Sequence, residues 1–342
     1  MRFRFVLRIP SLRIPSHHVN AGWRRLAVVI AIEATLYVAA AVGMAYVAGF
    51  EGVRHALERP DWPWFFACAA MVPPAFVGYY LAYRPIFNVE HPGIAIDRGC
   101  RLAVVSAGFG GFLDHGGGAL DKVALRAAGA SRREANVRVT MLAALEHGVL
   151  ALPCVVAASW LLATGIRTPS TGFTVPWVVG PLVGFAVGFW VTDRVRPYVQ
   201  RRGGWLARRV SVPLDAAHLV LTMARTPRRN ALPLAGMLVF WLADMFALWA
   251  GMAAFGFHMN GWAVIVAFGT AMIVTRRTGP LGGAGILDLA LPPTLWICGA
   301  PFAAAVLGTF AYRFFTLWLP LPFALATLPR LRGLLERDPQ TA

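Results

Sequence analysis

Long apolar runs, separated by short polar stretches, make up most of this chain. The clearest runs cover residues 26–48, 62–82, 139–163, 173–192, 231–257 and 301–328. Each is close to the roughly 20 residues that an α-helix needs to cross a bilayer. A shorter run, 261–275, is followed by a broken apolar segment with two adjacent prolines, Pro292 and Pro293. The pattern predicts an all-α, polytopic membrane helical bundle with about eight crossings.

Glycine and proline interrupt this pattern. Pro73 and Pro74 predict a kink inside the run 62–82. Residues 102–113 are apolar but too few to cross, so we interpret 102–120 as a re-entrant hairpin from the cytoplasmic side. Its glycines at 116–118 could cradle a phosphate with backbone N–H groups, and a plain flexible turn is an equally good interpretation. A second glycine-rich stretch precedes Asp288.

The two glycine-rich stretches share a pattern. Small residues, two apolar residues and then an aspartate occur at 110–114 and again at 283–288. The triplets 128–130 and 298–300, each with a central glycine, both precede a long span that carries charge. Counting charges orients these two spans oppositely. The sequence therefore suggests an inverted repeat, whose site would lie near mid-membrane at broken helices.

Arginine is concentrated on one predicted side of the membrane. The formal net charge is +16, Lys122 is the only lysine, and the loop 49–61 carries most of the acids near the N-terminus. Because cytoplasmic loops are enriched in basic residues, both termini are expected in the cytoplasm. We therefore expect a basic N-terminus (1–25), a single integral membrane domain (26–328) and a tail (329–342). The expected location is the inner (cytoplasmic) cell membrane.

The basic stretch 193–230 has an apolar face. It contains nine arginines, and apolar residues recur among them at roughly helical spacing, at Trp205, Leu206, Val210, Leu214 and Leu221. This spacing predicts an amphipathic helix on the inner leaflet, where each arginine gains about 1 kcal/mol from anionic headgroups. The positive-inside bias by itself accounts for most of this charge. No soluble module carries it, so we expect no nucleic-acid partner.

Cysteines and catalytic motifs give no sign of a cofactor or an enzyme. The cysteines lie in or beside apolar runs without paired spacing, and we interpret them as core residues: Cys68, Cys100, Cys154 and Cys298. The motifs His-x-x-x-His, His-Glu-x-x-His and Gly-x-Ser-x-Gly do not occur in the sequence. We expect a protein without catalytic activity, metal or cofactor.

Ionisable residues inside the apolar runs are the candidate functional groups. They are Glu33, Glu146, His147, Asp244, Asp288 and Arg313. Such residues usually face a partner or a watered cavity and mark a pathway. Arg313, together with Arg276 and Arg277, is expected to contact a phosphate, because a guanidinium binds phosphate in a bidentate fork.

The carboxylates of Glu146, Asp244 and Asp288 are expected to act as counter-charges or as partners of a headgroup amine. At mid-span Arg313 needs a carboxylate, Asp288 or Asp244, or a phosphate. The alternatives are a buried pair that only holds helices together and, for Arg313, a side chain that snorkels from a kinked helix. Glu146 and His147 are adjacent, so their side chains diverge by about 100° on a helix and do not form one site.

Residues 276–337 also resemble a known family. The segment 282–288 reads Gly-Gly-Ala-Gly-Ile-Leu-Asp, and Tyr312-Arg313 and Trp318 follow it. This order is similar to the C-terminal part of the lysylphosphatidylglycerol synthase transmembrane (flippase-like) family of integral membrane proteins. Asp288 stands where that family usually has glutamate.

The resemblance extends to Trp241, Asp244 and the pair Phe255-Gly256. It implies that the glycines and the Tyr-Arg pair belong to a lipid-handling site. Bifunctional members of the family carry a soluble aminoacyl-transferase domain after the spans, and this chain ends at Ala342 without one. The resemblance therefore implies no synthesis of an aminoacyl-lipid.

Two functions fit these observations. The leading hypothesis is a flippase that moves a phospholipid or a lipid-linked headgroup between leaflets, with membrane lipids carrying anionic headgroups as partners. The alternative is a non-transporting membrane partner that docks a glycosyltransferase or another lipid-modifying enzyme through residues 194–229. The expected substrate-binding residues are Arg313, Arg276, Arg277, Asp288, Gly282, Gly283, Gly285, Glu146, Asp244 and Tyr312.

Overall fold

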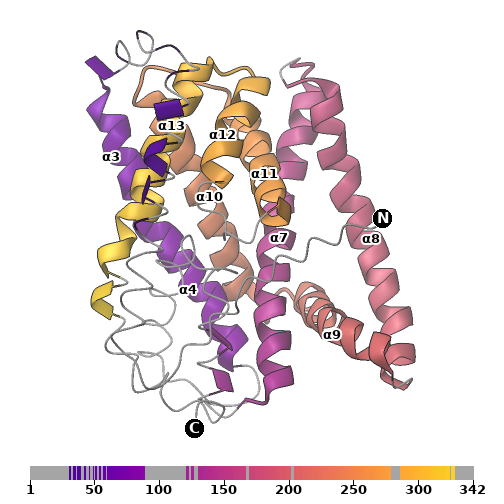
Figure 1. The fold of residues 1–342 in the computed structure, drawn as a ribbon. Coiled ribbons are helices and arrows are strands. Elements are labelled where there is room, and N and C mark those ends of the chain that lie inside the picture. Colours follow the sequence, from indigo (N-terminus) through magenta and orange to yellow (C-terminus); the bar gives the residue numbers. More distant parts are fainter. Residues whose placement is uncertain are drawn as a thin grey trace, which may run out of the picture.

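Every regular element in the described part of the chain is a helix (Figure 1). The computed structural model describes residues 60–88, 130–166, 169–201, 204–278, 286–323 and 325–327, with separate residues between 31 and 58 and between 121 and 126. The all-α prediction is confirmed for these residues.

Five helical segments are long and apolar enough to cross a membrane, among the residues searched. They are Trp62–Tyr83, Arg132–Ala163, Thr171–Arg201, Ala231–Ala253 and Phe302–Thr327. The chain is therefore a multi-pass membrane protein. The predicted number of about eight crossings is not reached in the described part, and most of the first expected span, 26–48, lies outside it.

Proline and serine explain two helix boundaries. The first segment contains α3 (Trp62–Ala70) and α4 (Val72–Asn88), with a break at Met71. Pro73 and Pro74 fall in the first turn of α4, where a missing N–H costs nothing, and the predicted kink is confirmed as this break. Ser131 caps α7 (Arg132–Ala163) by accepting a hydrogen bond from the Glu134 N–H at 3.2 Å. This cap lets α7 start before the predicted apolar run.

Helix α10 (Ala231–Ala253) lies at the centre of the bundle, in contact with α3, α4, α7, α11 and α13. Glycines allow its closest approaches. A Cβ atom at Gly236 would lie 2.6 Å from the carbonyl oxygen of Gly78 on α4, and one at Gly308 on α13 would lie 3.0 Å from Met252 Cα. Small residues at such crossings let membrane helices pack backbone to backbone. Gly78 and Gly308 thus fix α4 and α13 on α10.

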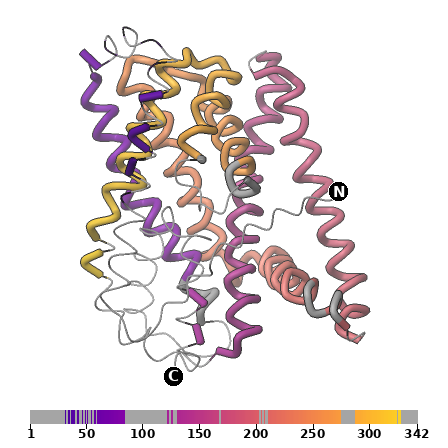
Figure 2. The backbone as a smooth tube through the Cα atoms, in the orientation of Figure 1, coloured from indigo at the N-terminus to yellow at the C-terminus, as the bar shows by residue number. Residues whose placement is uncertain are grey.

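Helices α11 (Gly261–Thr278) and α12 (Ile286–Ile297) are short, apolar and packed on each other. Both lie in the upper half of the molecule (Figure 2). The pair follows the upper end of α10 and leads through 298–301 into α13 (Phe302–Arg313), so it enters and leaves at the same face. Such a pair is re-entrant, and in membranes this geometry is tolerated only inside protein. The glycine-rich residues 279–285, part of the predicted broken segment, lie outside the described residues.

Helices α8 (Thr171–Arg201) and α9 (Trp205–Arg225) form the edge of the molecule. Helix α8 extends beyond the predicted run 173–192 and contacts α7 and α9. The predicted amphipathic helix is present as α9, which packs Ala216, Leu221 and Met223 inward. It lies across the lower end of the bundle (Figure 1).

Several predictions fall outside the described residues. These are the termini 1–25 and 329–342, the hairpin 102–120, and Glu33, Gly282, Gly283 and Gly285. The first copy of the suggested inverted repeat lies there as well, so the repeat stays a prediction.

Candidate functional site

Arg313 is the last residue of α13, which places it deep in the bundle. α13 begins after Pro301 at the upper face, so its 12 residues put Arg313 about 17 Å below that face. The residue is 7% exposed. A π-helical turn, Phe314–Trp318, follows directly. Arg313 therefore lies near the middle of a bilayer about 30 Å thick, where a charge needs a partner.

Asp288 lies at a similar depth on α12. It is nine positions before Ile297, the upper end of that helix, which corresponds to about 14 Å. Gly299, with a φ of 99°, follows α12, and Pro301 precedes α13. Glycine adopts this positive φ without strain, so the chain reverses tightly and the two helices pack side by side. The reversal brings Asp288 opposite Arg313.

Arg313 and Asp288 form a buried ion pair. Arg313 Nε donates to Asp288 Oδ1 at 2.7 Å, and the two side chains are 9% and 0% exposed. Of the two carboxylates considered from the sequence, Asp288 is the one bound. The alternative of a snorkelling Arg313 is excluded, because the side chain is buried.

Much of the hydrogen-bonding capacity of Arg313 remains after this pair forms. Within the described part of the chain, neither Nη1 nor Nη2 donates a hydrogen bond; only Nε does. These nitrogens carry four of the five N–H donors of a guanidinium, arranged in a planar fork. A fork of this kind fits two oxygens of a phosphate or carboxylate.

Asp244 and Tyr312 lie beside the ion pair. Asp244 is buried on α10, and it interacts with the Tyr312 hydroxyl and with the Arg313 charge. Tyr312 is 2% exposed and interacts with both aspartates. Four of the sequence-predicted site residues, on three helices, are therefore brought together.

Tyr37 completes what we call the buried cluster: Tyr37, Asp244, Asp288, Tyr312 and Arg313. Its hydroxyl donates to the Phe310 carbonyl oxygen at 3.1 Å, and its ring lies edge-on to Phe310, with centroids 4.9 Å apart. It interacts electrostatically with Asp288 and Arg313. Sequence reasoning missed Tyr37, because a tyrosine in an apolar run carries no signal of its contacts.

Glu146 lies on α7 beside Trp241, a turn below Asp244 on α10. Its backbone carbonyl accepts a hydrogen bond from the Trp241 indole at 2.8 Å, which ties α7 to α10. Glu146 is 7% exposed, whereas its neighbour His147 is exposed and bonds the Ala143 carbonyl. The prediction that these two side chains diverge is confirmed.

Arg276 and Arg277 are the remaining predicted phosphate ligands. They lie in the last turn of α11, at the inner end of the re-entrant pair. Their side chains are not described. The backbone thus places both arginines on the same re-entrant pair as Asp288, and their role stays a prediction.

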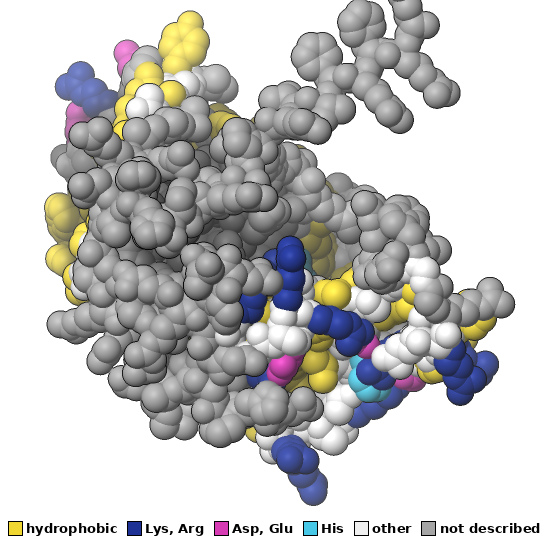
Figure 3. Space-filling model, turned by 60° about the horizontal axis from the view of Figure 1, so that its bottom comes forward, with side chains coloured by type: hydrophobic (Ala, Val, Ile, Leu, Met, Phe, Trp, Pro, Cys, Tyr) yellow, Lys and Arg dark blue, Asp and Glu magenta, His cyan; other side chains and the backbone are white. Residues whose placement is uncertain are grey.

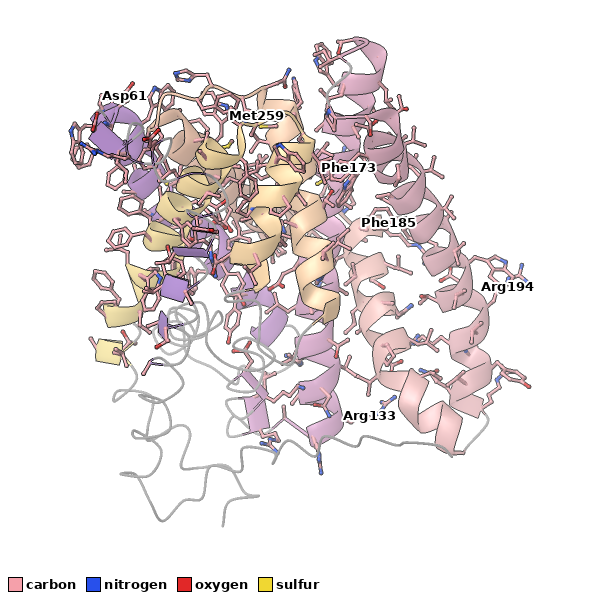
Figure 4. All side chains as sticks on the ribbon, turned by 45° about the horizontal axis from the view of Figure 1, so that its top comes forward. Asp61, Arg133, Phe173, Phe185, Arg194 and Met259 are labelled. Atoms are coloured by element: carbon pink, nitrogen blue, oxygen red, sulfur yellow. The ribbon has the colours of Figure 1, made fainter. Side chains whose placement is uncertain are left out.

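A second group of charges lies at the lower face. Asp215 on α9 accepts hydrogen bonds from Arg133 on α7 and from Arg196 and Gln200 on α8, at 2.5, 2.8 and 3.1 Å. The buried Asp215 therefore joins three helices. Sequence reasoning missed it because it treated this acid as part of a basic loop. Arg133 lies at the lower end of α7 and Arg194 projects from α8 (Figure 4).

Exposed arginines of α7, α8, α9 and the segment between α9 and α10 form what we call the lower basic face: Arg132, Arg133, Arg194, Arg201, Arg225, Arg228 and Arg229. In the view from below, blue arginine side chains lie around apolar atoms and a histidine (Figure 3). Among the residues searched, no group of three or more metal-binding side chains occurs.

Comparison with known proteins adds no identification. No protein-family model matches the chain, and no curated protein matches it significantly. The resemblance of 276–337 to the flippase-like family stays a prediction, so function is inferred from the geometry of the buried cluster.

Proposed function

We propose that this protein moves a phosphate-bearing lipid headgroup between the leaflets of the membrane. The observation that carries the proposal is the arginine at mid-depth that uses only Nε within the described structure. A buried guanidinium is costly, and one with spare donors is better explained by a ligand than by helix packing. The re-entrant pair α11–α12 supports this function, because broken helices at mid-membrane are typical of transporter sites.

The alternative, docking of a membrane enzyme through residues 194–229, has weaker support. Arg196 and Arg225 bind Asp215 and Asp193 at 2.8 and 2.6 Å, which ties α9 to α8. These arginines serve the packing of the protein itself. Arg194, Arg228 and Arg229 are exposed at the same face, where anionic lipid headgroups would attract them without a protein partner.

We place the lower basic face in the cytoplasm, following the excess of arginine there. With native cysteines replaced by alanine, Gly204→Cys should react with an impermeant maleimide only from the cytoplasmic side, and Gly172→Cys only from the opposite side. Reaction of both from one side would contradict this orientation.

Lipid translocation tests the function directly. Purified protein in liposomes that contain a fluorescent phospholipid should expose inner-leaflet label to an external quencher. Arg313→Gln should remove most of this activity, and Arg313→Lys should keep part of it, since charge remains but the fork is lost. Arg54→Gln is the matched control, because Arg54 is exposed and pairs only locally with Glu58.

Loss of activity in Arg313→Gln could also follow from loss of stability. The double variant Arg313→Gln/Asp288→Asn removes both partners and should regain stability without regaining translocation. Full translocation by this double variant would overturn the proposal.

A further inference from the structure

Asp244 is a buried carboxyl that the binding of a phosphate does not use. It lies 14 residues into α10, about 14 Å below the upper end of that helix, at the depth of Arg313. Within the described residues, the cation that acts on Asp244 is Arg313, whose hydrogen bond goes to Asp288 instead. Asp244 therefore faces a guanidinium that is already engaged with another carboxylate.

Among the described side chains, the other groups that act on Asp244 carry no positive charge. Cys68 faces it from α3, and Tyr312 faces it from α13. The other helices packed on α10 carry Tyr79, Tyr80 and Tyr83 on α4, and Arg132, Arg133, Glu134, Arg138, Glu146 and His147 on α7. The three arginines of α7 lie at least eight residues before Glu146, about 12 Å further down that helix. Tyr79 and Glu146 lie beside Phe240 and Trp241, a turn below Asp244. Among the described side chains, Arg313 is therefore the cation that acts on Asp244.

Burying an ionised carboxylate without a hydrogen-bonded cation costs much free energy, and such a group usually becomes neutral by binding a proton. We propose that Asp244 is a proton-binding site, and that it exchanges its proton when Arg313 changes carboxylate partner. The Tyr312 hydroxyl is the polar group beside the protonated acid. The proton site follows from the contacts alone, whereas its link to lipid movement rests on the proposed function.

The exchange conserves charge. In the observed state Asp244 carries the proton, and Asp288 is ionised and bound to Arg313. In the exchanged state Arg313 binds ionised Asp244, and Asp288 holds the proton. One proton leaves one carboxyl oxygen and joins another, while the guanidinium stays charged throughout. Because the buried cluster keeps the same net charge, the exchange avoids uncovering an unpaired ion in the membrane.

Infrared spectroscopy of the purified protein in lipid nanodiscs tests the proton directly. The wild-type spectrum should contain the C=O stretching band of a protonated carboxyl, shifted by deuterium, and Asp244→Asn should remove this component. Asp288→Asn should remove the same component, because Arg313 is then released to ionise Asp244. Arg313→Gln should increase the band, because both acids then bind protons. Asp193→Asn, in an exposed acid at the lower face, should leave it unchanged.

These outcomes separate the proposal from its alternatives. A band that survives in Asp244→Asn but vanishes in Asp288→Asn would show that Asp288 holds the proton and would overturn the proposal. A wild-type spectrum without any deuterium-sensitive acid band would overturn it as well. Should Asp244→Asn not fold, as judged by gel filtration, Asp244→Glu keeps a carboxyl at this position and should shift the frequency of the band. A band that shifts in Asp288→Glu but not in Asp244→Glu would overturn the proposal.

Translocation in the same liposomes tests the coupling. Imposing a pH difference across the membrane should change the rate of the wild type and leave the rate of Asp244→Asn unaffected. A wild type that translocates lipid regardless of the pH difference would refute the coupling and keep the proposed function. A wild type that moves no lipid would refute the function and leave the proton site to the infrared result.

Discussion

Asp288 at mid-depth and Asp215 at the lower face are both buried carboxylates that bind arginine, but their arginines differ. The side chains of Arg133 and Arg196, which bind Asp215, are 60% and 29% exposed. Arg313, which binds Asp288, is 9% exposed. The arginines at the lower face can therefore turn to water or lipid headgroups when their acid is lost, whereas Arg313 can turn only to another buried group, Asp244.

The difference shows how depth changes the meaning of one interaction. At the lower face the acid gathers three helices, and its arginines stay partly solvated, so each pair contributes modestly. At mid-depth the same chemistry is costly to build and more costly to break. We therefore interpret the Asp215 contacts as structural and the Asp288–Arg313 pair as functional.

The largest expected effect comes from breaking the pair at mid-depth. Arg313→Gln should lower the free energy of unfolding by about 3 kcal/mol, because Asp288 is left buried without its guanidinium. Asp288→Asn should cost less, because Asp244 can then ionise and bind Arg313, and the double variant should recover most of the loss seen in Arg313→Gln. Unfolding in mixed micelles, analysed as a double-mutant cycle, measures the coupling. Single-variant losses that simply add would contradict a coupled pair.

A smaller effect is expected at the lower face. Asp215→Asn should lower the free energy of unfolding by about 1 kcal/mol, because its arginines remain partly solvated. The same unfolding assay measures it. A cost equal to that of Arg313→Gln would remove the distinction between the two regions.

The smallest effect concerns His218 on α9, close to Asp215. Burial, followed by the Arg196 charge, holds the pKa of His218 below its ordinary value of 6.5, while Asp193 and Asp215 raise it. Asp215→Asn should therefore lower the pKa of His218 further, which an NMR titration of the imidazole would detect. An unchanged or raised pKa would show that Asp215 does not act on this histidine.

The lowered pKa of His218 also determines the direction in which pH changes the stability of the protein. Because the folded-state pKa of His218 is depressed, protonation favours the unfolded chain. Stability is therefore unaffected by His218 above about pH 6.5, the ordinary pKa of histidine. It falls as the pH drops from there through the folded-state pKa. His218→Gln should make unfolding less sensitive to acid, and an unaltered sensitivity would place the effect elsewhere.

The hydrophobic pattern of the sequence was sufficient to predict the helices themselves. The apolar run predicted to begin at 231 begins α10 at Ala231, and the run predicted to end at 163 ends α7 at Ala163. Backbone groups in a bilayer must bond within the segment, so a long apolar run has little choice but a helix. Proline placed the break near Met71 for an equally local reason.

The sequence also determined which residues have a high free-energy cost of burial, because a charge within an apolar run is costly wherever that helix packs. It left open whether Arg313 binds Asp288 or Asp244, since both acids are compatible with the same depth. Only the tertiary structure decided this. Gly299 and Pro301 fold α12 back on α13, and the glycine contacts of α10 set how closely Asp244 approaches. Which aspartate pairs with Arg313 depends on how each helix is rotated about its axis. Packing between segments that are distant in the sequence fixes this rotation, and the local sequence pattern does not.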